Sequence, residues 1–405
     1  SDLTMEGTTP ATTINASVVN NVLLSCFSRA VFRLNGEEID VLEDFPNIVN
    51  LQDMFGTNVE LRKGVLKQGG LVFDNAEKFN KTHPGVPVGN QDEINTGYTE
   101  RQSFFCTAQD ATTFNWNPTP RTFMKHLNMP FSQFLPASNN YIKIELQYSS
   151  NGWQQYIMAA VESEGKTLKP HLSNLSLRMR TYILSNKPAL EMERKLTRFG
   201  ITYYYNTVYS DRFFMPAGSK FYTTTLVNRG EPFAYVLVNL LLAEAAEGNV
   251  KQNPYQYLIK FCNGETEAAN PLLSLTAKQG NKQLNKFFPK PGDYTGEMAY
   301  LADYMRTAHL ARVFSPQQRA YYDTTFEEFQ NGFGTQLFSC SLVQASISSP
   351  AGRLSSGSVD FEFQFAKETD KNLVVKFTFI NPKTLNLAKR DGTGAPFKPT
   401  FLSQF

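Results

Sequence analysis

The residues best suited to chemistry are spread thinly along the chain, beginning with its histidines. There are four of them: His83, His126, His171 and His309. A zinc or iron site needs several ligands brought together, and its usual sequence sign is a pair spaced as HxxxH or HExxH. No two of these histidines have such a spacing. The sequence therefore predicts no metal site and no metal cofactor.

Nucleophilic and acid-base catalysis have no better support. The chain has no GxSxG elbow, and Gly69-Gly70 lacks both the lysine of a phosphate-binding loop and the spacing of a dinucleotide fingerprint, so we expect a turn there. The carboxylate pairs Glu37-Glu38 and Glu327-Glu328 are adjacent residues, which point apart on a strand and are usually solvated on a helix. We therefore expect no catalytic residues, no cofactor-binding residues and no enzyme activity.

The cysteines fit a structural role. There are four, far apart and without a CxxC pair: Cys26, Cys106, Cys262 and Cys340. Each has apolar, strand-like neighbours, as in Leu24-Ser25-Cys26-Phe27. Buried free thiols explain this spacing better than disulfides or zinc ligands, and they favour assembly inside a cell.

Basic and aromatic clusters each have a binding interpretation and a structural one. The interleaved basic residues are Arg178, Arg180, Lys278, Lys282 and Lys286. Because the net charge is only +2, solvated faces are a better interpretation of them than nucleic-acid binding. The clusters Tyr203-Tyr204-Tyr205 and Phe287-Phe288-Pro289 suggest stacking or sugar binding, but large aromatics also fill sandwich cores and subunit interfaces, which we favour.

The elements that carry these residues are mostly strands. The chain of 405 residues exceeds one core and suggests two domains, and its 33 Phe and 18 Tyr favour strands and broad interfaces. The longest apolar run, from 234 to 246, is shorter than the ~20 residues of a membrane span and contains Asn239 and Glu244, so we expect no transmembrane segment.

Strict alternation of apolar and polar residues predicts strands with one buried face in both halves. The apolar faces are Ile142, Ile144 and Leu146; Leu175, Leu177, Met179 and Ile183; and Val359, Phe361, Phe363 and Phe365. Tight hairpin turns are predicted at Asn35-Gly36, Asn151-Gly152 and Asn263-Gly264, because Asn-Gly readily adopts positive φ angles. A mostly antiparallel protein follows.

Two helices are expected among these strands. The first opens at Ser185 or Asn186, has Pro188 near its first turn and closes at Gly200, and it separates two strand-rich regions of similar size. The second begins at a Thr295 cap and runs to Met305 with apolar residues on one side.

The order of several segments resembles that of a known family. The segments are 17–21, 24–29 and 33–36; then 175–180, 188–199, 203–208 and 213–221; then 232–238, Lys251-Gln252-Asn253-Pro254-Tyr255 and 258–264; and finally 294–305, 326–338, 357–365 and 373–380. In this order the chain resembles the major capsid proteins of Polinton/Maverick elements and of related viruses, the adintoviruses and virophages. The subunit of that family consists of two jelly rolls in tandem.

The resemblance implies an all-β fold of two tandem eight-stranded antiparallel jelly-roll sandwiches with a few short helices. Residues 1–186 are expected to form the first jelly roll, 187–200 a linker helix and 201–405 the second jelly roll. The family has another strand before the region of Ser17, whereas residues 1–16 are few and polar. We therefore expect the first jelly roll to lack its own N-terminal strand by being incomplete, swapped or truncated there.

The resemblance also implies a structural role and no enzyme activity. The chain is expected to be a major capsid protein whose homotrimers form pseudo-hexameric capsomers that tile an icosahedral shell. Its partners are then itself, neighbouring capsomers, and penton and minor capsid proteins, with nucleic acid contacted at most weakly at the inner surface. Its location is the virion, after assembly in the nucleus or cytoplasm of the host.

Two other classes of protein share parts of this pattern. A carbohydrate- or receptor-binding β-sandwich, such as a fibre or spike, has the same aromatic all-β composition and remains the alternative. An enzyme on a cupin-like jelly roll needs clustered metal ligands, which the scattered histidines do not supply.

Metal analysis of the purified protein tests the absence of such a site. We expect no stoichiometric zinc or iron, because no ligand pair has the spacing that either metal requires. One tightly held transition metal per chain contradicts this expectation.

Overall fold

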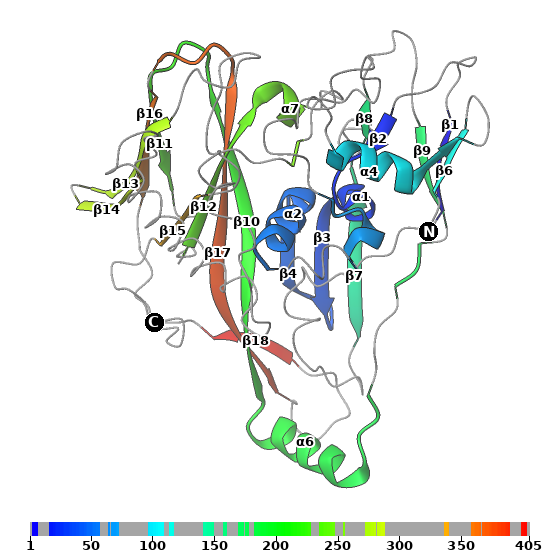
Figure 1. Cartoon of the computed structure of the whole chain (residues 1–405). Helices are drawn as coiled ribbons and strands as arrows, with labels where there is room; N and C mark the ends of the chain where they lie inside the picture. Colours follow the sequence, from blue (N-terminus) through cyan, green and yellow to red (C-terminus); the bar gives the residue numbers. More distant parts are fainter. Residues whose placement is uncertain are drawn as a thin grey trace.

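The computed structural model of the chain describes residues 2–6, 16–56, 64, 66–72, 96–108, 113–116, 141–149, 157–159, 169–173, 175–177, 182–227, 235–247, 254–255, 272–280, 282–287, 336–339, 358–365, 367–388 and 398–402. These residues form two β-rich units that lie side by side, with one helix below them (Figure 1).

The second unit is a sandwich with the strand order of a jelly roll. Its strands are β10 (Ile201–Met215), β11 (Phe221–Leu226), β12 (Tyr235–Leu242), β13 (Leu272–Gln279), β14 (Lys282–Phe287), β15 (Gln336–Ser339), β16 (Val359–Phe365), β17 (Leu373–Ala388) and β18 (Lys398–Leu402). One sheet has the order β10-β17-β12-β15, with β18 also paired to β17, and the other has the order β11-β16-β13-β14. The antiparallel pairs β10:β17, β11:β16, β12:β15 and β13:β14 nest within one another. A single long hairpin rolled into two sheets has this arrangement, which is that of a jelly roll.

Alternation along β16 shows why these residues form a sandwich. Val359, Phe361, Phe363 and Phe365 are buried in the core, as predicted. The polar residues between them face outward, where Asp360 accepts a hydrogen bond from Thr225 at 2.6 Å and Glu362 accepts one from Lys278 at 2.7 Å. Each polar side chain thus has a cross-strand partner on the outer face.

The first unit also shows nested antiparallel pairing. Its strands are β1 (Asp2–Glu6), β2 (Ala16–Val18), β3 (Phe27–Leu34), β4 (Glu37–Glu43), β5 (Cys106–Ala108), β6 (Thr113–Trp116), β7 (Ile142–Tyr148), β8 (Ile157–Ala159) and β9 (Lys169–Ser173). The pairs β1:β9, β2:β8 and β3:β7 nest, and the hairpin β5:β6 lies within them in sequence. The predicted all-β, antiparallel class is confirmed, and the count of eight strands in each jelly roll stays a prediction.

The expected lack of an N-terminal strand is wrong. Asp2–Glu6 form β1, which pairs with β6 on one edge and with β9 on the other. Backbone hydrogen bonds on both edges hold the segment, so its polar side chains do not prevent strand formation. Strand propensity depends strongly on such neighbours.

The helix predicted from Ser185 or Asn186 is confirmed as α6 (Asn186–Arg198), which follows Ser185 at its N-cap, and its role as a linker between two jelly rolls stays a prediction. Gly200 then has φ +72°, and a Cβ atom there would collide with the side chain of Asn386, so glycine alone fits this turn into β10. The other helices are α1 (Val22–Ser25), α2 (Phe45–Gly56), the 3-10 turn η1 (Leu66–Gly69), α4 (Thr96–Phe105) and α7 (Ala243–Glu247). The helix predicted from Thr295 lies outside the described residues.

Turn predictions are tested at two sites. Asn35 and Gly36 have φ angles of 54° and 88° and join β3 to β4, as expected for a tight hairpin. Gly70, at φ 89°, ends the turn predicted at Gly69-Gly70. The turns predicted at Asn151-Gly152 and Asn263-Gly264 lie outside the described residues.

Two apolar cores share the strands β10 and β17. The first core combines residues of the first unit, such as Phe32 and Ile48, with Tyr203 and Leu385 from the halves of β10 and β17 nearer α6. The second core includes Phe377 and its sandwich neighbours. All 15 residues of β10 pair with β17, so one continuous ribbon runs through both cores.

The strand predicted through Leu175, Leu177 and Ile183 is wrong in its described part. Residues 175–177 and 182–185 have no strand structure, and all seven are exposed. Alternation specifies a face suited to burial, but strand formation also needs a neighbouring strand, and no pairing of these residues occurs in the described chain.

Replacing Phe377 with alanine tests the second core. This side chain is fully buried, with ring centroids 5.6 Å from Phe213 and 4.9 Å from Phe361. We expect a loss of about 3–5 kcal/mol in unfolding free energy, measured by urea denaturation, because a cavity remains. The control Phe214→Ala, at an exposed position on β10, should lose less than about 1 kcal/mol. Equal losses contradict the assignment.

Candidate contact surfaces

Strand β17 is buried on both of its faces between Leu373 and Asn381. Residues at odd positions, such as Phe377, point into the second core. Residues at even positions face the first unit, because Lys376 and Thr378 contact Asp44 and Asn47 at the start of α2. The two units therefore meet on the second face of β17.

A charge pair lies at the centre of this contact. Lys376 Nζ is 3.1 Å from Asp44 Oδ2, and Ser210 of β10 donates a hydrogen bond to the same oxygen at 3.1 Å. The Lys376 side chain is 10% exposed and that of Asp44 is 36% exposed. A desolvated ammonium is costly unless it is paired, so Lys376 requires the Asp44 carboxylate where the two units meet.

Neutral hydrogen bonds surround the charge pair. Asn47 Nδ2 donates to Thr378 Oγ1 at 3.4 Å, and the Tyr205 hydroxyl donates to the Ile39 carbonyl at 3.0 Å. Burial, and then the negative charge of Asp44, raise the pKa of Tyr255 well above 10, so this phenol stays neutral. Hydrogen bonds depend on direction, so these bonds fix the orientation of the two units more narrowly than apolar packing alone.

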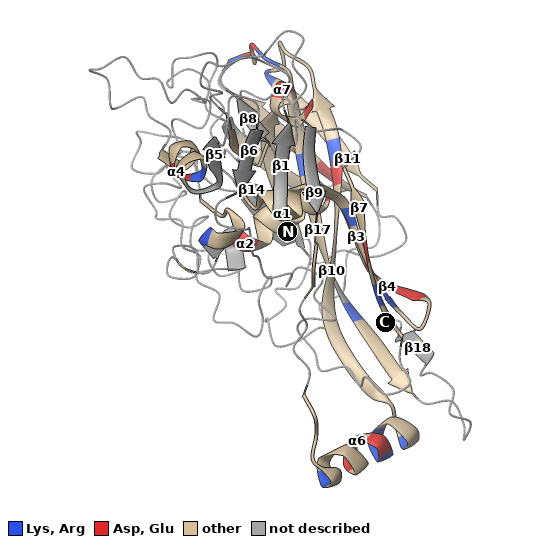
Figure 2. Cartoon of the chain, turned by 90° about the vertical axis from the view of Figure 1, so that its right-hand side faces the viewer, with Lys and Arg blue, Asp and Glu red and all other residues tan. Residues whose placement is uncertain are grey.

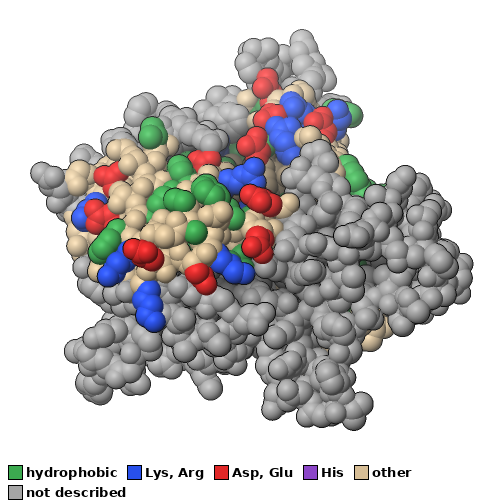
Figure 3. Space-filling view, turned by 90° about the horizontal axis from the view of Figure 1, so that it is seen from above, with side chains coloured by type: hydrophobic (Ala, Val, Ile, Leu, Met, Phe, Trp, Pro, Cys, Tyr) green, Lys and Arg blue, Asp and Glu red, His purple; other side chains and the backbone are tan. Residues whose placement is uncertain are grey.

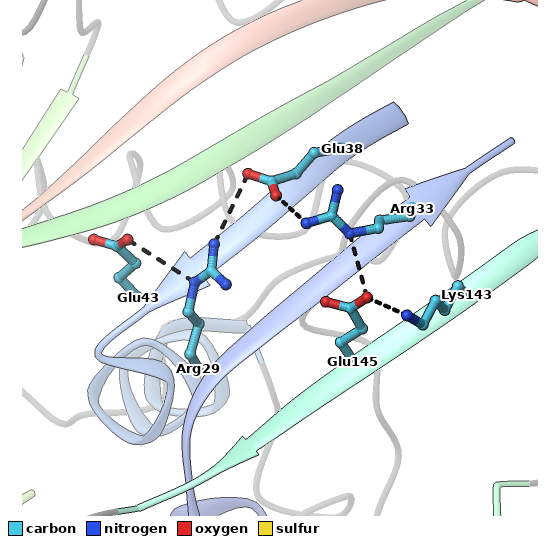
Figure 4. A network of polar contacts seen from close by, with 6 residues as sticks. All are labelled: Arg29, Arg33, Glu38, Glu43, Lys143 and Glu145. Carbon is cyan, nitrogen blue, oxygen red and sulfur yellow. Dashed lines mark hydrogen bonds and ion pairs between the residues drawn. The ribbon is translucent and has the colours of Figure 1, made fainter. Parts of the chain in front are cut away.

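The outer face of the sheet β4-β3-β7 carries a ladder of alternating charges (Figure 4). The ion pairs are Arg29–Glu43 at 4.0 Å, Arg29–Glu38 at 3.9 Å, Arg33–Glu38 at 2.7 Å, Arg33–Glu145 at 3.3 Å and Lys143–Glu145 at 2.6 Å. Three positive and three negative groups cancel. The opposite face of this sheet packs on the first core, so the ladder is a neutral, solvated surface.

Hydrogen bonding at the end of this ladder shifts two pKa values. The bond from Lys143 lowers the pKa of Glu145, and the same bond raises the pKa of Lys143. The contribution of Glu145 to stability is present above its unfolded pKa and is lost as the pH falls through the lowered folded value. The contribution of Lys143 to stability is present below its unfolded pKa and is lost as the pH rises through its raised folded pKa. Both groups are solvated, so the ladder favours strand register more than stability.

A buried polar network holds the β2–α1 region of the first unit. Arg101 of α4 is fully buried, and its guanidinium donates to the Val18 carbonyl at 2.6 Å, to Asn20 Oδ1 at 2.9 Å and to the Val72 carbonyl. Asn21 donates to Asp53 Oδ2 at 2.9 Å. These residues join four segments of the first unit. Arg101 therefore has a structural role there, and its donors are used within the chain.

The upper end of the second unit is a tip made of the β10–β11 and β16–β17 turns, which hydrogen bonds join to each other. Gly218 N donates to the Thr369 carbonyl at 2.6 Å, Thr369 N donates to the Ser219 carbonyl at 3.2 Å, and Ala217 N donates to Asn372 Oδ1 at 2.8 Å. Seen from above, apolar side chains gather within a rim of mixed charge on this side of the molecule (Figure 3). The tip is one candidate contact surface.

The opposite end is an element that we name the lower arm (described residues 175–177 and 182–204). It comprises α6, the extended segment before it and the start of β10, and α6 lies at the lower end of the molecule with Met192 and Leu196 packed on the first core (Figures 1 and 2). Only Leu196 of α6 is buried. Its exposed large apolar residues are Leu175, Leu177, Tyr182, Ile183, Leu184, Leu190, Phe199 and Tyr204.

The described chain allows a partial test of the predicted absence of sites. Cys26 is a buried free thiol, as predicted, and burial raises its pKa to about 12. Cys262, Cys340 and the side chain of Cys106 are outside the described part of the structure. His171 lies on β9, and the other three histidines fall outside the described residues. Within the described ranges, no three His, Cys, Asp or Glu side chains gather as metal ligands do. The same ranges contain no helix long and apolar enough to span a bilayer.

The sequence contains carboxylate pairs, basic residues and aromatic clusters that are candidates for binding or catalysis. Where the structure describes these residues, they lie in cores, in ion pairs or on exposed strand faces. Glu38 belongs to the charge ladder, Glu37 is exposed, and Lys278 pairs with Glu362. Tyr203 and Tyr205 are buried in the first core, as favoured, whereas Tyr204 is exposed. The positions outside the described residues or without a described side chain are Arg178, Arg180, Lys282, Lys286, Phe287-Phe288-Pro289 and Glu327-Glu328.

Sequence reasoning missed the residues that join the two units. Lys376 is a single charge within the apolar run Leu373–Ile380, a pattern that indicates a buried, paired ammonium. Asp44 followed by Pro46 is a helix-start signal that also went unused, and α2 begins there. Nothing local identifies these two residues as partners, because they are 332 positions apart.

Comparisons with known proteins return structural likenesses alone. No family model and no curated protein matches the chain. Similar solved structures are the mavirus major capsid protein (10% identity, 99% of this chain and 83% of that one, TM-score 0.46), the Faustovirus major capsid protein (9%, 93% and 74%, 0.46), and PBCV-1 VP54 fitted into the virophage Sputnik (9%, 100% and 90%, 0.45). Because these TM-scores are below 0.5, the fold is assigned from the strand order of the chain itself.

The contact between the units is tested by a double-mutant cycle of Asp44→Asn and Lys376→Met. We expect losses of about 1–3 kcal/mol for each single change and a coupling of about 1–2 kcal/mol, measured by urea denaturation. Asp44→Asn should cost more, because it leaves the better-buried ammonium without its counter-charge.

The control is Lys278→Met, which removes a surface pair with Glu362 and should lose under about 1 kcal/mol. A larger loss for Lys376→Met than for Asp44→Asn contradicts the role given to desolvation.

Proposed function

We propose that the chain is a structural subunit of a viral shell, a double jelly-roll major capsid protein without enzyme activity. Each subunit presents two jelly rolls side by side, and three subunits close into a pseudo-hexameric capsomer that tiles an icosahedral shell. The observation that carries the proposal is the jelly-roll order of β10–β17 with a second β unit packed directly on β17. Jelly rolls also occur in lectins and cupins, so the pairing of two such units is the informative feature.

The proposed domains follow the sequence division. Residues 1–186 form the first jelly roll, 187–200 the linker helix and 201–405 the second jelly roll. The two separate cores support this division, and so does the position of α6 between β9 and β10. The ribbon β10–β17 nevertheless contributes Tyr203 and Leu385 to the first core, so the two rolls are not independent bodies.

The proposed lineage is the Polinton/Maverick, adintovirus and virophage type. It is supported by the order of sequence segments, including Pro254-Tyr255, of which Tyr255 is buried in the first core. The proposed partners are other copies of the chain, neighbouring capsomers, and penton and minor capsid proteins. The net charge of +2 supports weak contact with nucleic acid at most, and the proposed location is the virion.

Light scattering on gel-filtered protein tests the function. We expect a mass of three times 45.7 kDa that persists at high salt, because burial of apolar surface is screened far less than ion pairs. Electron microscopy should then find closed or hexagonally tiled particles. A constant mass of 45.7 kDa at all concentrations, together with specific glycan binding, favours the carbohydrate-binding alternative and contradicts the proposal.

A further inference from the structure

The lower arm concentrates apolar surface that the chain does not bury. Of the 13 exposed large hydrophobic side chains of the described residues, eight lie on this arm. Ile183 is 101% exposed and Phe199 is 80% exposed. Monomeric proteins rarely expose contiguous apolar patches above a few hundred Å², so such a concentration marks a contact surface.

The sequence of the arm also has the pattern of a buried element. Leu175 and Leu177 alternate with Ser176, as on a strand with one covered face, yet all three are exposed. Alternation of this kind fits a strand that packs on one side. The described chain leaves that side exposed, so it is available for contact with another molecule.

The charges of α6 limit which kind of molecule can bind the arm. The face toward the body carries Met192 and Leu196, which pack on the first core. Lys187, Glu191, Arg194 and Arg198 follow spacings of four, three and four residues, so basic and acidic side chains share a stripe on the exposed side of the helix. A second copy of this chain, whose net charge is only +2, meets no strong repulsion from such a mixed stripe.

Neither nucleic acid nor an anionic bilayer fits the arm as well as a protein surface. The helix has four basic and two acidic side chains, a net charge of +2, which is small for a phosphate-binding surface. Aliphatic side chains such as Ile183 and Leu184 gain little from bases or phosphates. Acidic residues such as Glu191 and Glu193, both exposed, also repel anionic headgroups.

The exposed area suits a protein interface. Aromatic side chains bury ~150–250 Å² each, and the eight exposed side chains of the arm, three aromatic and five aliphatic at 46% to 101% exposure, together present on the order of 800 Å². A standard interface buries ~800 Å² on each partner.

We propose that the lower arm binds a second copy of this chain. A threefold ring is closed by one heterologous contact repeated around the axis, so in the proposed trimer the arm binds a surface other than that copy's own arm. The inference rests on the proposed function and names the surface through which the subunits join.

The first experiment compares the wild-type protein with the double variant Leu190→Ser, Phe199→Ser by sedimentation. The variant should raise the dissociation constant of the trimer on the order of 100-fold or more, because central apolar side chains carry most interface energy. The matched control is Tyr141→Ser, Val227→Ser, which makes the same kind of change at exposed positions outside both the arm and the tip and should leave the mass unchanged. Equal dissociation by both variants overturns the assignment to the arm.

The second experiment keeps the chain nearly native. A photo-crosslinking benzoylphenylalanine at position 183 should yield covalent dimers on illumination, whereas the same group at position 227 should not. Crosslinks within one chain only, formed in an intact trimer, overturn the proposal. This result does not depend on whether the serine variant folds.

The outcomes separate this proposal from the function on which it rests. A wild-type protein that forms no oligomer overturns both the proposed function and the assignment of the lower arm as a subunit interface. A wild-type trimer that the arm variant leaves intact overturns the interface assignment alone. If the variant instead loses binding to phosphatidylserine-containing vesicles or to oligothymidine while staying trimeric, the arm is a lipid or nucleic-acid surface and the interface assignment is overturned.

Discussion

The burial of β17 on both faces is the constraint on which the arrangement of the molecule depends. One face fills the core of the jelly roll, and the other places Lys376 against the first unit. An ammonium group in that position needs a counter-charge and directional hydrogen bonds, which Asp44 and Ser210 supply. The pairing therefore fixes one relative position of the two β units, where apolar contact alone would allow several.

A single ribbon carries this constraint along the molecule. Strands β10 and β17 pair over 15 residues, contribute to both cores, and connect the tip at one end with α6 at the other. Because β17 is buried between Leu373 and Asn381 and β10 pairs with it along all of its residues, the two ends of the ribbon keep a defined position relative to the cores. A subunit of a regular shell needs such defined contact surfaces, since each contact is repeated many times.

The surfaces differ in the interactions that they offer. The charge ladder on β4-β3-β7 is neutral, and its charges pair with one another within the subunit. We therefore expect it to contribute little to binding a partner. The lower arm is apolar and lies at the lower end of the molecule. With a net charge of +2, the whole chain has no long-range field to drive or oppose association. In the proposed assembly, apolar burial is then the main driving force.

The sequence by itself determined the elements whose cause is local. The alternation in β16, the Asn35-Gly36 hairpin and the start and end of α6 follow from strand period, turn chemistry and helix caps acting over a few residues. Resemblance added the expectation of two jelly rolls, and the nested order of β10–β17 agrees with it.

Only the tertiary structure decided which surfaces meet. It gave β1 two neighbouring strands, left the alternating residues around Leu175 uncovered, and placed Lys376 against Asp44. The physical reason is that a local pattern specifies how strongly a face favours burial, whereas the group that buries it comes from residues far away in sequence. For β17 that group is a carboxylate 332 positions earlier, and no local pattern encodes such a distance.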